Sequence, residues 1–165
     1  ADPSAIIAGK KKGEIIYLTI ADIEKRHPDK ILTDLLAYHE KTHFDQVAIE
    51  AVQFQEFFAG HVEKEAHRRG LTLNVLAVPE HTDKDLRIIR LQPWIKNGWI
   101  RFRRSGMQEL IRHFIYYRPK GKGGHDDGPD AVEKLMNLLV TGVGKIEYQT
   151  VASRTSGFGK QKGAC

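Results

Sequence analysis

Strand-like and helix-like segments alternate along this chain, and this alternation limits it to folds that combine a sheet with helices. Residues 4–9 and 14–20 are rich in apolar and β-branched side chains, and the polar turn 10–13 separates them. Two such runs joined by a short polar segment predict a β-hairpin. Apolar side chains then recur at helical spacing after Pro28, and residues 45–50 return to strand character.

The alternation continues through the rest of the chain. A helix striped with phenylalanine ends at Gly70, and residues 73–78 read as a buried strand. The next helical region starts near Asp83, is interrupted by Pro93 and leads to a strand at 99–102. Two more helices are expected, and their starting signals are Ser105 with Gln108, which form a capping box, and Pro129. This order of elements predicts an α/β fold.

The length of the chain indicates one domain, and its net positive charge indicates a polyanionic partner. The chain has 165 residues, and we expect one domain over residues 1–141 followed by a loosely ordered tail over 142–165. Its 26 lysines and arginines exceed its 21 acids, giving a net charge of +5 that attracts nucleic acid. The single cysteine excludes an internal disulfide. No apolar run approaches the roughly 20 residues that span a bilayer, and no secretion signal is present, so we expect a soluble, intracellular protein without a membrane partner.

Three carboxylates gather where a glycine-rich loop turns into the last helix. They are Asp126, Asp127 and Asp130. Carboxylate oxygens are the ligands that Mg²⁺ and Mn²⁺ prefer, and acids this close repel one another unless a cation lies between them. The alternative is that these acids only cap the helix.

Two distant acids are candidate partners for this cluster. Glu50 lies at the carboxyl end of the strand 45–50, where ligands gather in open α/β sheets, and Asp2 lies near the start of the chain. Together the acids form a constellation suited to two-metal phosphodiester hydrolysis. In that reaction one ion activates water and the other stabilises the leaving oxygen.

Several motifs occur in a characteristic order. They are Asp-Pro-Ser at 2–4, Val-Ala-Ile-Glu at 47–50, Lys-Asp-Leu-Arg-Ile at 84–88, Leu-Gln-Pro at 91–93, Asn-Gly-Trp-Ile-Arg-Phe at 97–102 and His-Asp-Asp-Gly-Pro-Asp-Ala at 125–131. In this order they resemble the nuclease domain of the large terminase subunit of tailed bacteriophages, the DNA-packaging motor. The resemblance extends to about residue 141. It implies a ribonuclease H-like fold, with a mixed sheet flanked by helices on both faces.

The resemblance also implies a set of metal ligands. In the family the first Asp, the mid-chain acid and an Asp of the last cluster hold two Mg²⁺ or Mn²⁺ ions, and these correspond to Asp2, Glu50 and Asp127. Asp126 and Asp130 stay open as alternatives within the cluster. The family's first Asp ends a central strand, which would have to precede Ala1 here, and the motor's phosphate-binding Gly-x-x-x-x-Gly-Lys pattern is absent. The chain therefore looks like an excised nuclease domain.

Other polar residues near the acids are candidates for contacts with DNA. His125 is a candidate catalytic residue that assists proton transfer or contacts the scissile phosphate. Phosphate contacts are expected from a set of cations, and a solvated charged face is the alternative for each: Lys84, Arg87, Arg101, Arg103, Arg104, Lys120 and Lys122. The last two lie with three glycines in a segment that we expect to be a mobile flap.

A competing pattern occurs in the first helix. His39 and His43 flank Glu40 in the His-Glu-x-x-His spelling of zinc metalloproteases, in which two histidines bind zinc and the Glu acts as base. This helix ends close to the second histidine, whereas a protease helix continues past it. A solvated helix end is the favoured interpretation.

We therefore expect a metal-dependent endonuclease that cuts double-stranded viral DNA during genome packaging, with little sequence preference. Two alternatives stay open. The first is another ribonuclease H-like nuclease, acting on DNA junctions or on RNA–DNA hybrids, and the second is a non-catalytic DNA-binding module of the motor. The resemblance further implies portal protein and small terminase subunit as partners. It places the protein in the cytoplasm of an infected bacterial host, or in a prophage.

Overall fold

A computed structural model describes residues 3–50, 55–79, 82–120 and 125–141. Asp2, Lys122 and the tail 142–165 lie outside these described residues, so the expectations that rest on them are not addressed. Within the described residues the elements are β1 (Pro3–Lys12), β2 (Ile15–Lys25), α1 (Pro28–Thr42), β3 (Val47–Glu50), α2 (Gln55–Arg68), β4 (Val75–Val78), α3 (Lys84–Ile89), α4 (Leu91–Lys96), β5 (Ile100–Phe102), α5 (Gln108–Tyr116) and α6 (Asp127–Thr141).

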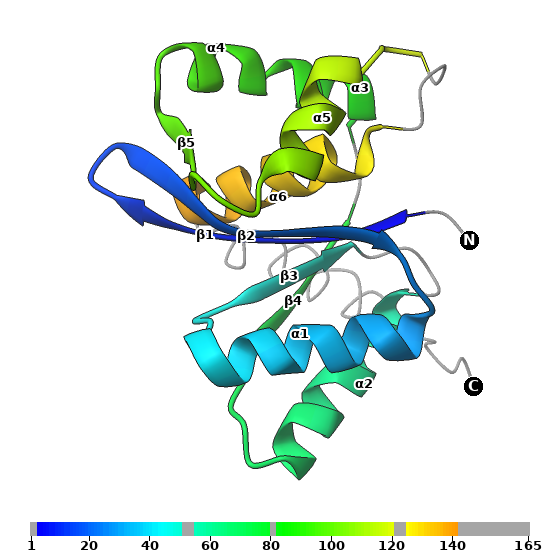
Figure 1. The fold of residues 1–165 in the computed structure, drawn as a ribbon. Helices are drawn as coiled ribbons and strands as arrows, with labels where there is room; N and C mark the ends of the chain where they lie inside the picture. Colours follow the sequence, from blue (N-terminus) through cyan, green and yellow to red (C-terminus); the bar gives the residue numbers. More distant parts are fainter. Residues whose placement is uncertain (1–2, 51–54, 80–81, 121–124, 142–165) are drawn as a thin grey trace, which may run out of the picture.

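A long β-hairpin forms the centre of the molecule (Figure 1). β1 and β2 pair antiparallel up to Lys12 opposite Ile15, and Gly13 takes the left-handed φ of 60° that the tight turn requires. The hairpin expected from the sequence is confirmed. Both strands are longer than expected, because backbone pairing continues beyond the apolar runs into charged residues.

The strands make two sheets in the described residues. β2 pairs in parallel with β5, which completes a mixed three-stranded sheet in the order β1-β2-β5. β3 and β4 pair in parallel as a second sheet, in which Glu50 lies opposite Val78 at the carboxyl ends of both strands. The α/β class with a mixed sheet is thus confirmed.

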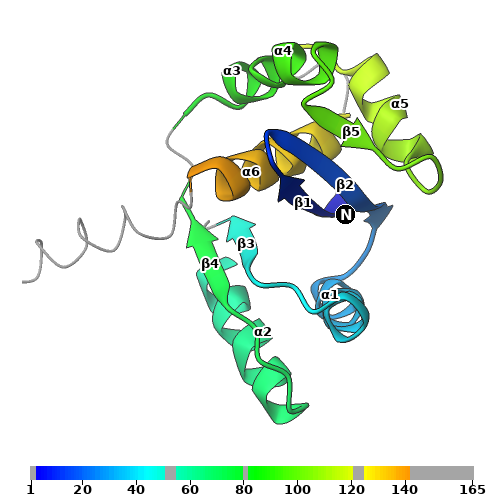
Figure 2. The ribbon, with the colours of Figure 1, turned by 90° about the vertical axis from the view of Figure 1, so that its left-hand side faces the viewer.

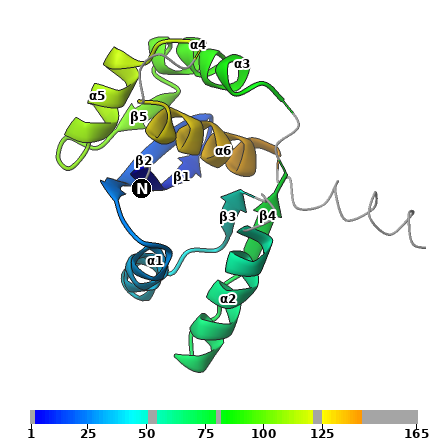
Figure 3. The same ribbon diagram turned by 90° about the vertical axis from the view of Figure 1, so that its right-hand side faces the viewer.

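Successive side chains of β1 pack into two different hydrophobic clusters, because neighbouring residues of a strand point to opposite faces. Ile6 belongs to the cluster built with α1, α2 and β4, in which Leu36 and Val62 are fully buried. Ile7 packs against the cluster that α4, α5 and α6 build over the other face. Figures 2 and 3 show α1 and α6 on opposite sides of the hairpin, so helices cover both faces of the mixed sheet.

Two helix boundaries differ from the sequence expectation. The helical region capped by Asp83 breaks at Arg90 and not at Pro93. Pro93 lies in the first turn of α4, where its missing N–H removes no helical hydrogen bond. α5 begins after Met107 without a side-chain cap, so the capping role expected of Ser105 is wrong.

Candidate metal centre

The three clustered acids lie at different depths at the start of α6. Asp126 precedes the helix, Asp127 is its first residue, and Asp130 is buried within the first turn. Burial raises the pKa of the Asp127 carboxyl, and the negative charge of Asp126 raises it further. Lys84 partly offsets these effects through its charge. Asp127 is therefore an acid whose charged form a nearby cation would stabilise.

Basic side chains from α3 pair with the other two acids. The Lys84 ammonium lies 2.9 Å from a carboxylate oxygen of Asp126. Burial opposes the charge of this ammonium, but the contact with Asp126 outweighs burial and raises the pKa of Lys84. Arg87 places one guanidinium nitrogen 3.0 Å from Asp130, and both side chains are only 8% exposed. Arg87 therefore lies in the protein interior, which corrects the expectation that it faces DNA phosphates.

Lys134 connects the acids of α6 to β3. Its ammonium hydrogen-bonds to Asp130 and lies 3.8 Å from a carboxylate oxygen of Glu50, the last residue of β3. Figures 2 and 3 show the carboxyl end of β3 directed toward α6. Two acids that the sequence analysis paired across 80 positions thus share one cation.

A second buried acid extends this network. Glu133, on the next turn of α6, is 1% exposed. It accepts hydrogen bonds from Arg90, at 2.8 Å, and from Asn137, and Arg87 lies 3.9 Å from it. Glu133 was not among the residues predicted from the sequence. Two sequence features could have indicated it: Glu133 follows Asp130 by about one helical turn, and Arg87 and Arg90 are available as partners.

The described residues do not bring the predicted acids into one tight cluster. Glu50, Asp126, Asp127 and Asp130 contain no set of three whose oxygens all lie within 4.8 Å of one another. Glu50 and Asp130 meet at Lys134, and Asp126 and Asp127 lie at the same helix end. Asp2, the remaining predicted ligand, is outside the described residues.

His125 lies against α5. Its ring centroid is 5.2 Å from that of His113, at an interplanar angle of 75°, and 6.0 Å from that of Tyr116. Burial lowers the pKa of His113, and the negative charge of Glu109 acts in the opposite direction. The structure therefore places His125 beside a second histidine that the sequence analysis did not consider.

The other predicted DNA-contacting cations lie at the surface. Arg103, Arg104 and Lys120 are exposed. Arg101 is also exposed; it donates a hydrogen bond to the Gly98 carbonyl and its guanidinium lies 6.0 Å from the centre of the Tyr17 ring. These positions are compatible with phosphate contacts.

Described residues on both sides of 121–124 contact the start of α3. Asp85 accepts hydrogen bonds from the Tyr117 hydroxyl and, at 2.7 Å, from the Lys120 backbone N–H. Lys84, its neighbour in sequence, pairs with Asp126 beyond the glycines. The start of α3 thus contacts both Lys120 and Asp126.

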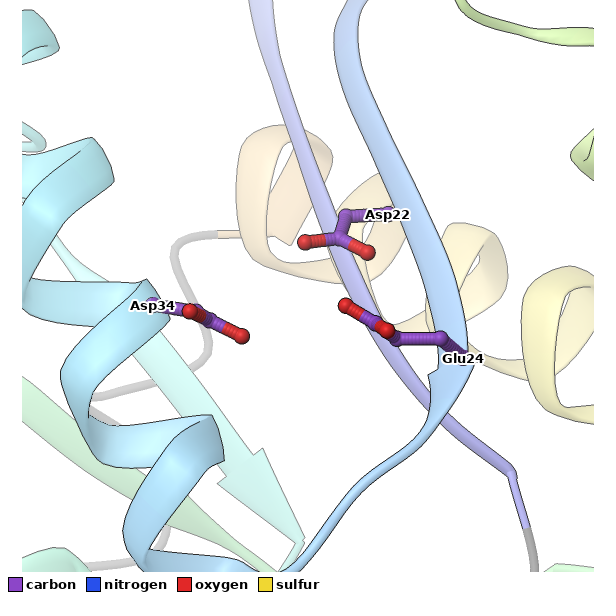
Figure 4. A group of neighbouring side chains, drawn as sticks. All are labelled: Asp22, Glu24 and Asp34. Carbon is purple, nitrogen blue, oxygen red and sulfur yellow. The ribbon is translucent and has the colours of Figure 1, made fainter.

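A second acidic group was not anticipated. Figure 4 shows Asp22 and Glu24 of β2 and Asp34 of α1 directed toward one another. One oxygen from each of the three carboxylates lies within 4.8 Å of the other two. The buried Arg26 guanidinium lies among them, 2.7 Å from Asp22 and 2.8 Å from Asp34. Because an arginine already occupies this group, it is an ion-pair network, which joins β2 to α1.

This network includes a tyrosine. The Tyr38 hydroxyl donates a hydrogen bond to Asp22 at 2.9 Å. Burial and this bond to a carboxylate raise the pKa of Tyr38 to about 12. The hydroxyl therefore stays protonated at neutral pH and remains a donor to Asp22.

The His-Glu-x-x-His pattern does not form a zinc site. His39 is buried, its Nε2 lies 2.9 Å from the Thr72 carbonyl, and its Nδ1 accepts from the Phe44 N–H at 3.0 Å. Both ring nitrogens are thereby engaged by the backbone. His43 ends α1 in a left-handed conformation, so the helix does not continue as a protease helix would.

None of the helices in the described residues is long and apolar enough to cross a membrane. Comparison with protein-family models and with curated proteins finds no match to this chain.

Proposed function

We propose that this chain is a ribonuclease H-like nuclease domain that cuts double-stranded DNA during viral genome packaging. The observation that carries the proposal is the approach of Glu50 to α6. A parallel strand delivers this acid from its carboxyl end to the helix that bears Asp126, Asp127 and Asp130, which is where ligands gather in α/β folds.

The side chains at this place are of the type that binds a hard divalent cation, although the described acids do not bring three oxygens within 4.8 Å of one another. Carboxylates are the ligands that Mg²⁺ and Mn²⁺ prefer, and Asp127 has a raised pKa and no ion pair among the described residues. We assign Glu50 and Asp127 as the residues that would hold metal, together with Asp2. Asp130 is held instead by Arg87 and Lys134, and we assign it to positioning the helix. A bound pair of ions would activate water and stabilise the leaving oxygen.

The lysine and arginine side chains near the acids have two roles in this proposal. Lys84 and Arg87 hold the start of α6 in place through the acids with which they pair. The exposed Arg103, Arg104 and Lys120 are free to contact phosphates, which positions a duplex without reading its sequence.

A nuclease assay with matched variants tests this proposal. Glu50→Gln and Asp127→Asn should lose Mn²⁺-dependent cleavage of duplex DNA, because each removes a charged ligand with little change in volume. Glu40→Gln and Asp29→Asn change exposed acids of α1 and should cleave like wild type. Circular dichroism checks that each variant is folded, and a chelator control checks the metal requirement. Cleavage by purified Glu50→Gln at saturating Mn²⁺ would refute the assignment.

The same assay separates the alternatives. Competition among duplex DNA, a four-way junction and an RNA–DNA hybrid distinguishes a packaging nuclease from a resolvase or a hybrid nuclease of the same fold. A non-catalytic DNA-binding module is favoured by one observation, the neutralisation of Asp126 and Asp130 by basic side chains. That alternative predicts DNA binding without cleavage under any metal condition.

A further inference from the structure

Two histidines beside α6 have properties that the proposed nuclease does not use. His113 lies on α5 with its side chain 4% exposed, and His125 lies just before α6. Their ring centroids are 5.2 Å apart, and the rings meet at 75°. The pair therefore joins two helices at the point where the acidic cluster begins.

Each ring has a buried nitrogen without a hydrogen bond. The Nδ1 atoms of His113 and His125 are both shielded from solvent, and neither has a hydrogen-bond partner within the described residues. A buried polar atom left unpaired costs free energy, so most buried polar atoms of native proteins have a hydrogen-bond partner, a ligand or a water. The two unpaired Nδ1 atoms therefore indicate that a ligand binds to these histidines.

The contacts of His113 favour a metal ion as this ligand. Its Nε2 lies 3.4 Å from the Glu109 carboxylate, one turn earlier on α5, and this contact places the ring proton on Nε2. The lone pair of Nδ1 is then directed away from the carboxylate. A carboxylate behind a histidine is the usual arrangement around ligating histidines, because it orients the ring and raises its basicity.

The spacing of the two rings matches a shared metal ion. Two imidazoles bound to one tetrahedral zinc, each at about 2.0–2.1 Å, place their ring centroids roughly 5 Å apart. Both histidines line a pocket of about 320 Å³ beside β2, which has room for waters as further ligands.

We propose that His113 and His125 form a binding site for zinc, or for another divalent metal that prefers imidazole, separate from the carboxylate site of the nuclease. Nδ1 of each ring supplies a ligand, and water from the pocket completes the coordination. The ion would tie α5 to the residue that precedes α6, and would thereby fix the position of the acids that follow. This inference does not depend on the nuclease proposal.

Zinc titration of the full chain tests the site. Isothermal titration calorimetry should show one saturable equivalent of Zn²⁺ for wild type and a loss of at least tenfold in affinity for His113→Phe and for His125→Ala. The second variant changes a partly exposed residue, so it tests the site even if the buried replacement impairs folding. Zinc should also raise the melting temperature of wild type by several degrees and leave that of His125→Ala unchanged.

Two controls identify where zinc binds. His43→Ala removes the exposed histidine that follows α1, and Glu50→Gln alters the carboxylate site; both should bind zinc like wild type. Cobalt(II) should give the intense visible bands of a tetrahedral site in wild type and lose them in His125→Ala. Absence of zinc binding by wild type, or binding that survives in both His113→Phe and His125→Ala, would overturn the proposal.

Discussion

The ion pair between Arg87 and Asp130 should be one of the largest single contributors to stability on α3. Replacing Arg87 by Met keeps an unbranched apolar side chain and removes the charge, which leaves Asp130 and Glu133 without one of their cations. Breaking a buried ion pair from one side costs about 3–5 kcal/mol, because the remaining charge stays buried. Lys134 still contacts Asp130, and Arg90 still contacts Glu133. We therefore expect the lower end of that range, about 3 kcal/mol.

Urea unfolding measures this loss as a lower midpoint at an unchanged slope. The matched control is Arg112→Met, which breaks an exposed ion pair with Glu109 on α5 and should leave the midpoint close to that of wild type. Adding Asp130→Asn to Arg87→Met should recover part of the stability, because it removes the uncompensated charge. If Arg87→Met and Arg112→Met shift the midpoint equally, the buried network does not stabilise the fold as argued.

Two further outcomes follow from the acids. In the presence of a chelator, Asp127→Asn should be more stable than wild type at pH 7. The pKa of Asp127 is raised in the folded protein, so the charged carboxylate lowers the free energy of unfolding. The gain in stability should disappear as the pH falls below the ordinary carboxyl range, where Asp127 is protonated in both states. A gain that persists at pH 3 in urea unfolding would contradict this origin. Lys134→Met should bind Mn²⁺ at least tenfold more tightly than wild type in calorimetry. The Lys134 ammonium lies about 4 Å from Glu50, and at an effective dielectric of about 20 a unit charge at that distance repels a metal ion by several kcal/mol. Lys134→Arg keeps the charge and should bind like wild type; equal affinities for the Met and Arg variants would show that the ammonium does not compete.

Local patterns were enough to predict most of the elements. The polar turn before Gly13 indicated the hairpin, and the leucines after Pro28 indicated α1. Boundaries were harder, because the proline at 93 fits a first turn as well as it fits a break. The sequence also could not show that β3 and β4 form a sheet of their own within the described residues, since strand pairing depends on distant contacts.

The partners of charged residues could not be predicted from local sequence. Arg87 looks like a surface cation on a short helix, and only the packing of α3 on α6 brings it to Asp130. The acids Asp22 and Glu24 look like polar positions on an exposed strand, yet Arg26 gathers them with α1. The position of Glu50 near α6 was anticipated because strand ends in α/β folds gather ligands, which is a rule about topology and needs no knowledge of side-chain partners.

The division of the core between the two faces of the hairpin has a consequence for the order of folding. The cluster around Ile6 and Leu36 uses buried residues up to Val75, so it can assemble from the first half of the chain. The cluster around Ile16 and Leu18 requires Val132 and Met136, which close a loop of more than 100 residues. Contacts between residues so far apart in the sequence form slowly, because closing a long loop costs chain entropy before the contacts can stabilise it. During synthesis, one face of the hairpin therefore stays incompletely covered until α6 is made, and the acids at the start of α6 reach their positions only then.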